Sequence, residues 1–299
     1  MHISDFRYHR PATLDEAVQL LNDSTDGVLL AGGTDLLVDL KQGKRSHQDV
    51  ISLTRLPELE SIDVVGNSLV IGAMVTHNQL VHSATIREHC NAISEAAESI
   101  ATEQIRNAAT VGGNLCTAAS CADTAPILIA LGAAVEIVNK QGSRTLPLSE
   151  FFVDHRTTAL ARGDVLSAIV VPLPPPGVGA AYEKFGLRQA ANISVASVAV
   201  TVHVQEERVA AARFVMGAVA PTPKISPRAY SLVKGQTVAD LLSSRALTEE
   251  VGAAVAADAE PIDDLRGTAQ FRREIVAVLA RRSLAKALSR AMGSGGVMP

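Results

Sequence analysis

Two short segments with paired glycines are the strongest candidates for chemistry in this sequence. The first is Ala31-Gly32-Gly33-Thr34-Asp35 and the second is Thr110-Val111-Gly112-Gly113-Asn114. Glycine lets the backbone approach a ligand closely and adopt positive φ, and successive amides in such a turn can bind a phosphate. The neighbouring hydroxyl and amide side chains add further donors. Each pair could also serve only a tight turn, and the residues alone do not choose one phosphate ligand over another.

Other familiar site motifs are absent from the sequence. It contains no G-x-G-x-x-G, G-x-x-x-x-G-K-[ST], H-E-x-x-H or G-x-S-x-G pattern. His77 follows Thr76 at the end of an expected strand, where an imidazole could bind a ligand or have a structural role. Cys90, Cys116 and Cys121 do not form a disulfide framework and are too few for a four-thiolate cluster. We therefore expect free buried thiols and no metal site.

Hydrophobic periodicity predicts the elements that must position these segments. Thr13 to Glu16 has the form of a capping box at the start of a helix. Val28 to Ala31 predicts a buried strand that runs directly into the first glycine segment, and residues 68–73 predict a strand ahead of the second. Asp123 can cap a short apolar helix that tolerates Pro126 in its first turn.

The length of 299 residues predicts more than one domain. The segment Pro172 to Gly177 is rich in proline, which stiffens a chain and interrupts strand pairing, so we expect a boundary there. Beyond it we expect paired strands over 194–204 and 209–219 and a helix over 269–291. We predict three domains and a mobile tail, over residues 1–60, 61–176, 177–292 and 293–299.

Composition and charge exclude several classes of protein. A hydrophobic content of 47% with 19% charged residues is typical of a folded chain, and a net charge of −4 is too weak to indicate nucleic-acid binding. We expect the Lys and Arg residues between Arg266 and Arg290 to form a solvated helix face. No apolar run reaches the roughly 18 residues that a transmembrane helix needs. Because residues 1–5 also lack the pattern of a secretory signal, we expect a cytoplasmic location.

Taken in order, these motifs resemble the medium, FAD-binding subunits of molybdenum hydroxylases, the family of xanthine dehydrogenase and carbon monoxide dehydrogenase. The resemblance covers nearly the whole chain. It is carried by Leu30–Leu36, Thr110–Leu115, Ala122-Asp123, Asp164–Pro172 and Tyr182–Phe185. It implies an α+β fold of the vanillyl-alcohol-oxidase type. In this fold two α/β subdomains hold FAD between them, and a C-terminal α+β domain closes one side.

The resemblance also implies which residues bind FAD. Asp123 matches an acidic residue that contacts the sugar or phosphate-bearing part of FAD, with helix capping as the alternative. Lys184 matches a lysine near the flavin, with an ordinary strand-edge charge as the alternative. Thr76 lies where the family approaches its flavin, and Ile100 and Leu166 match apolar positions that pack on the cofactor. The predicted set, with no catalytic residue, is Leu30, Ala31, Gly32, Gly33, Thr34, Asp35, Leu36, Thr76, Ile100, Thr110, Gly113, Asn114, Asp123, Leu166 and Lys184.

The function that the resemblance implies is electron transfer. A large molybdopterin subunit would oxidise the organic substrate, and a small subunit with two [2Fe-2S] clusters would pass electrons to FAD in this chain and on to an external acceptor such as NAD or a quinone. One alternative is a stand-alone FAD-dependent reductase of the same fold. That reductase needs a proton donor and a substrate anchor, and Tyr182, Arg188 and Tyr230 form no such pattern. A second alternative is a scaffold subunit without FAD.

Overall fold

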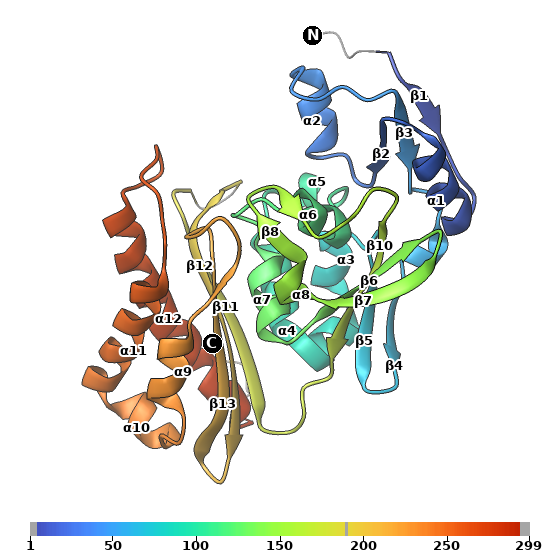
Figure 1. Cartoon of the computed structure of the whole chain (residues 1–299). Helices are drawn as coiled ribbons and strands as arrows, with labels where there is room; N and C mark the ends of the chain where they lie inside the picture. Colours follow the sequence, from blue (N-terminus) through green and yellow to red (C-terminus); the bar gives the residue numbers. More distant parts are fainter. Residues whose placement is uncertain (1–4, 189–190, 294–299) are drawn as a thin grey trace.

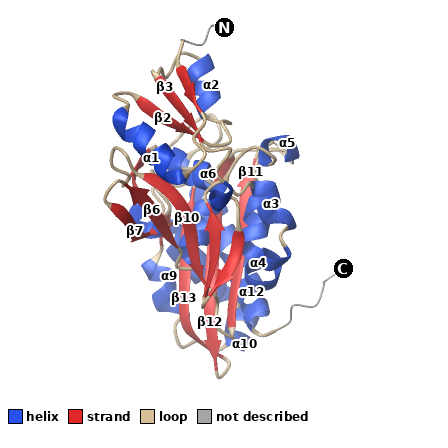
Figure 2. Ribbon diagram, turned by 90° about the vertical axis from the view of Figure 1, so that its right-hand side faces the viewer, coloured by secondary structure: helices blue, strands red, loops and turns tan. Residues whose placement is uncertain are grey.

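The computed structural model describes residues 5–188 and 191–293. Within that part of the chain, three main sheets follow one another along the sequence, each covered by helices (Figure 1). The turned view places the first sheet at one end of the molecule, beyond the strands of the other two (Figure 2). Residues 294–299, which make up most of the expected mobile tail, lie outside the described residues.

The first sheet is parallel and positions the first glycine segment. Its strand order is β1 (Arg7–His9), β3 (Asp49–Ser52) and β2 (Gly27–Leu30), with α1 (Leu14–Asp23) between β1 and β2, and α2 (Leu36–Lys41) after β2. The strand predicted over 28–31 is confirmed, although its residues are half-buried rather than buried. Thr13 caps α1 through the Glu16 amide as predicted, but the Glu16 carboxylate accepts a hydrogen bond from the amide of Ala12 instead of Thr13.

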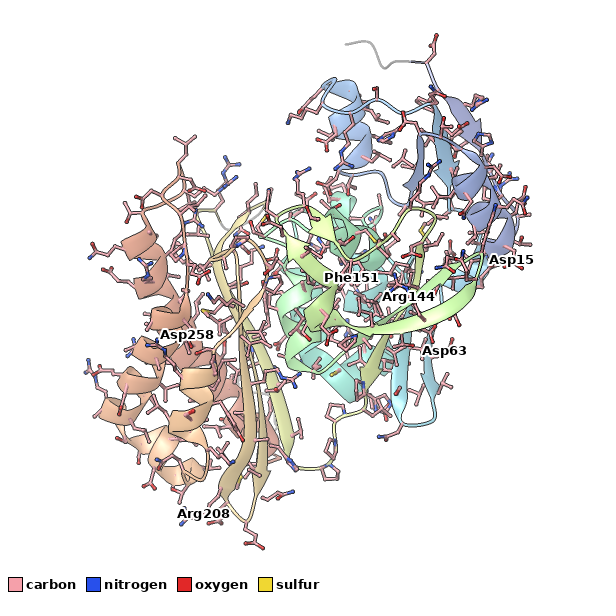
Figure 3. The ribbon with its side chains drawn as sticks, viewed as in Figure 1. Asp15, Asp63, Arg144, Phe151, Arg208 and Asp258 are labelled. Carbon is pink, nitrogen blue, oxygen red and sulfur yellow. The ribbon has the colours of Figure 1, made fainter. Side chains whose placement is uncertain are left out.

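The second sheet is antiparallel and contains the largest core. Its order is β4 (Ile62–Val65), β5 (Ser68–Gly72), β10 (Val165–Pro172), β6 (Ala134–Asn139) and β7 (Gly142–Pro147). The helical and short elements of this unit are η1 (Pro57–Leu59), α3 (His77–His82), α4 (Ala84–Glu98), α5 (Glu103–Arg106), α6 (Val111–Thr117), α7 (Thr124–Ala130), α8 (Leu148–Phe151), β8 (Phe152–Asp154) and β9 (Thr157–Thr158). Phe151 is fully buried inside this unit, whereas Asp15 and Asp63 lie at the outer surface (Figure 3).

The third sheet lies between two groups of helices. Its antiparallel strands are β11 (Val178–Gly186), β12 (Ser194–Gln205), β13 (Arg208–Gly217) and β14 (Lys224–Ile225). One face is covered by α9 (Pro227–Val233), α10 (Val238–Ser243), α11 (Arg245–Asp258) and α12 (Ala269–Ala291), and the other faces α4 and α7 of the second unit (Figure 1). Each unit has its own hydrophobic cluster, and Tyr182, Ala199 and Val215 of the third sheet belong to the cluster of the second unit.

The long C-terminal helix α12 has the predicted range, but not all of its charged side chains lie on a solvated face. Arg272 is only 4% exposed and donates to the carbonyls of Val195 and Ala218 at 2.8 and 3.1 Å. Farther along, Arg290 pairs with Glu95 on α4. A buried cation needs several fixed acceptors, and here two backbone carbonyls and the Asp264 carboxylate supply them. The expectation of a solvated face is therefore wrong for these two positions, because both arginines attach α12 to neighbouring elements.

Candidate functional site

A cavity of about 750 Å³ lies between the first and second units and includes both glycine segments in its wall. Its volume falls within the roughly 300–1,000 Å³ that is usual for small-molecule and cofactor sites. The predicted residues in its wall are Ala31, Gly32, Gly33, Thr34, Asp35, Leu36, Ile100, Thr110, Gly113, Asn114 and Leu166. Four predicted residues are not part of the wall: Leu30, Thr76, Asp123 and Lys184. The chain fold therefore brings together the two segments that the sequence singled out.

The first glycine segment leaves the end of β2 in a conformation that its glycines permit. Gly33 has φ of +72°, in the left-handed region that disfavours side chains. A Cβ on Gly32 would lie 1.8 Å from the carbonyl oxygen of Ala108, so this glycine allows a close approach between backbones. Within the described part of the chain, the amides of residues 32–35 donate to no protein acceptor. These amides are therefore available to an anionic ligand.

The second glycine segment is helical, which corrects the expectation of an amide-lined turn. Thr110 is the N-cap of α6, and its hydroxyl accepts from the Gly113 amide at 3.0 Å. The amides of Val111 and Gly112 donate to the carbonyls of Val75 and Ala73, each at 2.9 Å. Because these amides are already bonded, the segment cannot offer them to a phosphate. Thr110, Gly113 and Asn114 still line the cavity, and their contact with a cofactor stays a prediction.

Asp123 and Lys184 form a buried ion pair at the junction of the second and third units. Asp123 Oδ2 accepts from Lys184 Nζ at 2.7 Å, while Oδ1 accepts from Tyr182 Oη at 2.7 Å and from Ser194 Oγ. Lys184 Nζ also donates to the Ser99 carbonyl at 2.8 Å. Burial, and then the charge of Asp123, raises the pKa of Tyr182 well above its ordinary value.

These contacts remove the two structural alternatives considered for this pair. Asp123 makes no side-chain cap to α7, so the helix-cap interpretation is wrong. The Lys184 side chain is only 6% exposed, so an ordinary strand-edge charge is wrong as well. Their contact with FAD stays a prediction, because the carboxylate and the ammonium both have protein partners and neither residue is part of the cavity wall.

Thr76 and His77 have different roles although they are adjacent. The Thr76 hydroxyl accepts from the Gln79 amide, and the Thr76 amide donates to Gln79 Oε1, which completes a capping box for α3. His77 belongs to the cavity wall and is fully buried. Neither of its ring nitrogens has a hydrogen-bond partner in the described structure. Burial, assisted by the positive charge of Arg106, lowers the pKa of His77 to about 4, so the ring is neutral near pH 7.

Arginines in the cavity wall were not predicted from the sequence. Arg156, at φ of +57°, donates to Asp39 Oδ2 at 3.3 Å, and Arg45 lies 3.7 Å from the same oxygen. Arg162 donates to the Ser24 carbonyl at 2.6 Å. Arg156 and Arg162 thus bridge from the second unit to the first. They occupy loops without periodicity or motif, so the sequence carried no signal for them.

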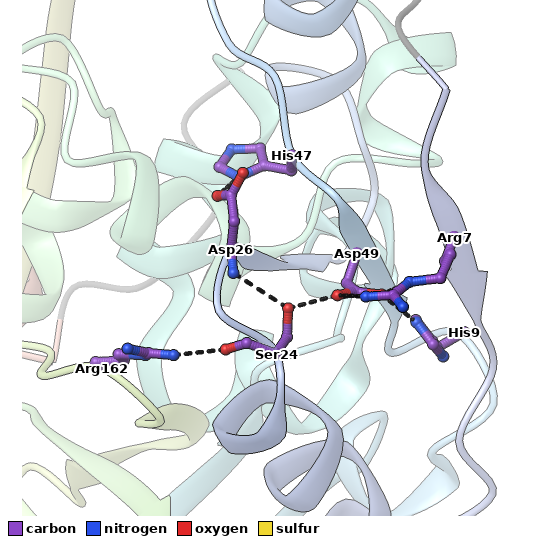
Figure 4. A network of polar contacts seen from close by, with 7 residues as sticks. All are labelled: Arg7, His9, Ser24, Asp26, His47, Asp49 and Arg162. Atoms are coloured by element: carbon purple, nitrogen blue, oxygen red, sulfur yellow. Dashed lines mark hydrogen bonds and ion pairs between the residues drawn. The ribbon is translucent and has the colours of Figure 1, made fainter.

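Ser24 also connects the cavity wall to the interior of the first sheet (Figure 4). Its hydroxyl donates to Asp49 at 2.6 Å, and Arg7 and His9 contact the same carboxylate, each at 2.7 Å. The Arg7 guanidinium, with Ser24 and His9, holds the pKa of the Asp49 carboxyl well below its usual range. Asp26, in the cavity wall, pairs with His47 at 2.9 Å. This network fixes the strand ends beside the cavity.

The cysteines differ in exposure, and the expectation of buried thiols holds fully for only one of them. Cys90 is buried, Cys121 is partly exposed, and Cys116 is exposed in the cavity wall. All three are free thiols. Over residues 5–188 and 191–293, no group of His, Cys, Asp and Glu is arranged to hold a metal ion. In the same ranges, no helix has the length and apolar character required to span a bilayer.

The fold and the site together define a mixed α+β protein with a cofactor-sized cavity between two of its units. Residues 4–174 match the family model of the FAD binding domain in molybdopterin dehydrogenase, and residues 180–287 match that of the CO dehydrogenase flavoprotein C-terminal domain. The chain belongs to the FAD-binding subunits of the molybdopterin dehydrogenase family. It is an oxidoreductase subunit, and its cofactor is FAD.

Relatives match this chain over almost its full length. It is 32% identical to the xanthine dehydrogenase FAD-binding subunit of Escherichia coli O157:H7, over 96% of this chain and 97% of that one. It is 30% identical to the nicotine 6-hydroxylase medium subunit of Paenarthrobacter nicotinovorans, over 97% and 100%. In the solved carbon monoxide dehydrogenase of Hydrogenophaga pseudoflava, one chain is similar with a TM-score of 0.91 and 32% identity, over 97% and 99%. The predicted fold class is thereby confirmed.

The Asp123–Lys184 pair generates a prediction about stability. Asp123→Ala should lower the free energy of unfolding by about 3–5 kcal/mol, because it leaves a buried ammonium without its carboxylate. Removing the cation as well, in Asp123→Ala with Lys184→Met, should restore a substantial part of this loss. Urea denaturation of the two variants and of the parent protein measures the difference. Equal stability of the single and double variants would show that the Asp123–Lys184 ion pair does not stabilise the junction of the second and third units.

The buried neutral His77 generates a prediction about pH. Its pKa is about 4 in the folded chain and about 6.5 when unfolded, so the unfolded state binds more protons between these values. Its contribution to stability is therefore complete above pH 6.5 and is lost as the pH falls towards 4. The loss should be about 3 kcal/mol, at 1.36 kcal/mol per pKa unit. His77→Leu should flatten the pH dependence of the unfolding free energy in this window, and an unchanged slope would contradict the assignment.

Proposed function

We propose that this chain is the electron-transfer subunit of a molybdenum hydroxylase complex. In the proposal, electrons arrive from [2Fe-2S] clusters of a partner subunit, pass through FAD in the cavity, and leave to an external acceptor. The observation that carries the proposal is the cavity in which both glycine segments meet, because the unpaired amides of residues 32–35 are suited to a cofactor pyrophosphate. Bound FAD would supply the redox chemistry of electron transfer.

The residues of the cavity fit such a group. The Thr34 hydroxyl and the side chain of Asn114 stand beside the two glycine segments and can add hydrogen bonds. Arg45 and Arg156 lie in the same wall beside Asp39, and their remaining N–H groups can donate to a pyrophosphate. Ile100 and Leu166 offer an apolar surface to a ring system. The wall thus combines donors, cations and apolar contacts, which is the mixture that a dinucleotide requires.

The names of the relatives support the proposed partners. Two relatives are a nicotine 6-hydroxylase medium subunit and a carbon monoxide dehydrogenase medium chain, names that describe one chain of a larger assembly. By analogy we propose a molybdopterin-containing large subunit and a [2Fe-2S] small subunit as partners, with NAD, a quinone or another carrier as the acceptor. We include in this proposal the expected cytoplasmic location and the domain boundaries at residues 60, 176 and 292.

Neither Tyr182 nor His77 is suited to be the proton donor that a stand-alone reductase needs. Tyr182, one candidate for that role, is 4% exposed and donates to Asp123, and it is not part of the wall. His77 is in the wall, but its burial and low pKa favour the neutral form, which is a poor proton donor at neutral pH. These contacts favour a chain that holds FAD and leaves substrate oxidation to a partner.

A pair of glycine variants tests the location of FAD. Gly113→Val should lower FAD affinity at least tenfold, because it adds bulk to the cavity wall where a Cβ already meets Thr110 Oγ1 at 2.9 Å and Ala31 Cβ at 3.7 Å. A Cβ at Gly112, which also lines the cavity, meets the Ala73 backbone carbonyl at 2.6 Å, so Gly112→Ala should mainly lower thermal stability. Flavin absorbance per chain and the melting temperature distinguish the two variants. Normal flavin content in folded Gly113→Val would refute the assignment of this segment to the cofactor site.

A second experiment tests whether substrate oxidation requires the partner subunits. The chain purified alone and loaded with FAD should show no flavin reduction by aldehydes or N-heterocycles, since the proposal assigns substrate oxidation to a partner subunit. After the partner subunits are added, substrate should bleach the flavin absorbance at about the rate of the complete complex. The control is reduction of the lone chain by dithionite, which checks that its flavin is redox-active. Substrate-dependent bleaching by the lone chain would favour the stand-alone reductase.

A further inference from the structure

Strand β2 is the edge strand of the first sheet, and its free side belongs to the cavity wall. The order of this sheet is β1-β3-β2, so among the described residues β2 pairs with a strand on one side only. Gly27, Val28 and Leu29 line the cavity, whereas Leu30, the last residue of the strand, does not. The free side of an edge strand presents N–H and C=O groups that no neighbouring strand uses. The cavity is therefore bounded here by peptide groups as well as by side chains.

The hydrogen bonds to β3 identify which peptide groups of β2 face the cavity. The carbonyl of Asp26 accepts from the first amide of β3 at 3.3 Å, and the carbonyl of Leu30 accepts from the amide that follows β3 at 2.9 Å. Peptide groups of successive residues in a strand point to opposite sides, so alternate residues bond to the same neighbour. Val28, which lies between these two residues, therefore also points to β3. Gly27 and Leu29 direct their N–H and C=O groups away from β3, and both residues line the cavity.

Leu29 offers a hydrogen-bond donor beside an acceptor. Its side chain packs against the hydrophobic cluster of the first unit, yet the residue is only half-buried and lines the cavity. In an extended residue the N–H and the C=O point in the same direction and lie next to each other. A planar ring edge on which an accepting nitrogen adjoins a donating amino group is complementary to this pair. Adenine has such an edge, whereas guanine has a carbonyl oxygen in place of the amino group.

The first glycine segment brings either ring of FAD within reach of β2. The amides of residues 32–35, the proposed pyrophosphate site, follow β2 after a single residue, Ala31. The polar edge of the flavin carries two carbonyl acceptors around one N–H donor. The single donor and single acceptor of Leu29 would leave one of these carbonyls without a partner, which costs binding energy. The adenine edge, with one acceptor and one donor, is matched completely.

A loop of the second unit bounds the same part of the cavity. Its residues Leu160, Ala161 and Gly163 line the cavity. Arg162 of this loop donates to the carbonyl of Ser24 at 2.6 Å, close to the start of β2 (Figure 4). This contact holds the loop beside the strand. Leu160 and Ala161 thus give a flat base an apolar surface next to the peptide edge, a combination that is usual in ligand sites.

We propose that the free side of β2 is the adenine subsite of the cavity, in which the Leu29 amide donates to a ring nitrogen of adenine and the Leu29 carbonyl accepts from the adenine amino group. This inference rests on the proposed function, and it adds backbone groups to the FAD-binding residues that the sequence predicted. That prediction included Leu30, whose carbonyl is bonded on the side of β3. A base with a carbonyl in place of the amino group would set its oxygen against the Leu29 carbonyl, so the subsite selects adenine.

The selectivity for adenine is tested with nucleotides, because a side-chain substitution does not remove a backbone carbonyl. ADP and IDP carry the same ribose and pyrophosphate and differ only in the base, where IDP has a carbonyl in place of the amino group. ADP should compete with FAD for the full chain at a concentration at least about tenfold lower than IDP, because a site built around hydrogen bonds rejects a base that reverses them. Fluorescence titration of FAD measures both inhibition constants. Equal competition by ADP and IDP, or no competition by ADP, overturns the proposal.

Hydrogen exchange of single backbone amides, measured by NMR on the FAD-free full chain, tests the position of the base. ADP and inorganic pyrophosphate at equal saturation stabilise the fold equally. The Leu29 amide should nevertheless exchange at least about tenfold more slowly with ADP, because only ADP brings an acceptor to it. The Leu30 amide is the matched control, since it points to β3 and should exchange alike with both ligands.

Protection of the Leu29 amide by ADP, and not by pyrophosphate or FMN, supports the proposal. An unprotected Leu29 amide with ADP, or equal protection by FMN, overturns it and leaves the proposed function standing. A parent chain that binds no FAD would instead defeat the proposed function itself.

Discussion

The cavity depends on a close approach between the backbones of segments far apart in the sequence. A Cβ at Gly32 would lie 1.8 Å from the Ala108 carbonyl oxygen, and one at Gly112 would lie 2.6 Å from the Ala73 carbonyl oxygen. A side chain at Gly32 would force the first unit away from the second, whereas one at Gly112 would displace the backbone at Ala73 within the second unit. The ion pair of Arg156 with Asp39 and the contact of Arg162 with Ser24 then join the same two units at the edges of the cavity. These polar contacts accompany the close approach of the two units that Gly32 permits.

Buried charge connects the remaining parts of the molecule. Asp123 on the second unit is bonded to side chains of β11 and β12, and Arg272 on α12 is bonded to carbonyls of the third sheet. Each buried ion has several fixed partners, which is the condition under which such a group is tolerated. Lys184 also donates to the carbonyl of Ser99, directly before the cavity residue Ile100. The junction of the third unit with the second thus lies one residue away from the cavity wall.

Local patterns in the sequence predicted the elements well, and the contacts between them poorly. The helix over 269–291 and the strands around residues 28–31 and 194–204 have the hydrophobic spacing of their class, and the structure confirms them. The partners of Asp123 could not be predicted, because Tyr182 lies 59 residues away in the sequence and the pairing depends on how the units pack. The contacts of the arginines in the cavity wall, Arg45, Arg156 and Arg162, could not be predicted either, because no local sequence pattern indicates them. A short segment with two glycines is compatible with a turn or with the start of a helix. In the second segment Thr110 caps the helix α6, so the helix forms.

The two glycine segments look alike in the sequence, yet they offer different chemistry to a ligand. A helix N-terminus binds an anion through amides that have no partner within the protein. In α6 the amides of Val111, Gly112 and Gly113 are all bonded, so this segment contributes shape and side chains. The unpaired amides lie at residues 32–35, next to the wall arginines that pair with Asp39. We therefore expect a phosphate of the cofactor to bind at the first segment, and neutral parts of the cofactor to lie against the second.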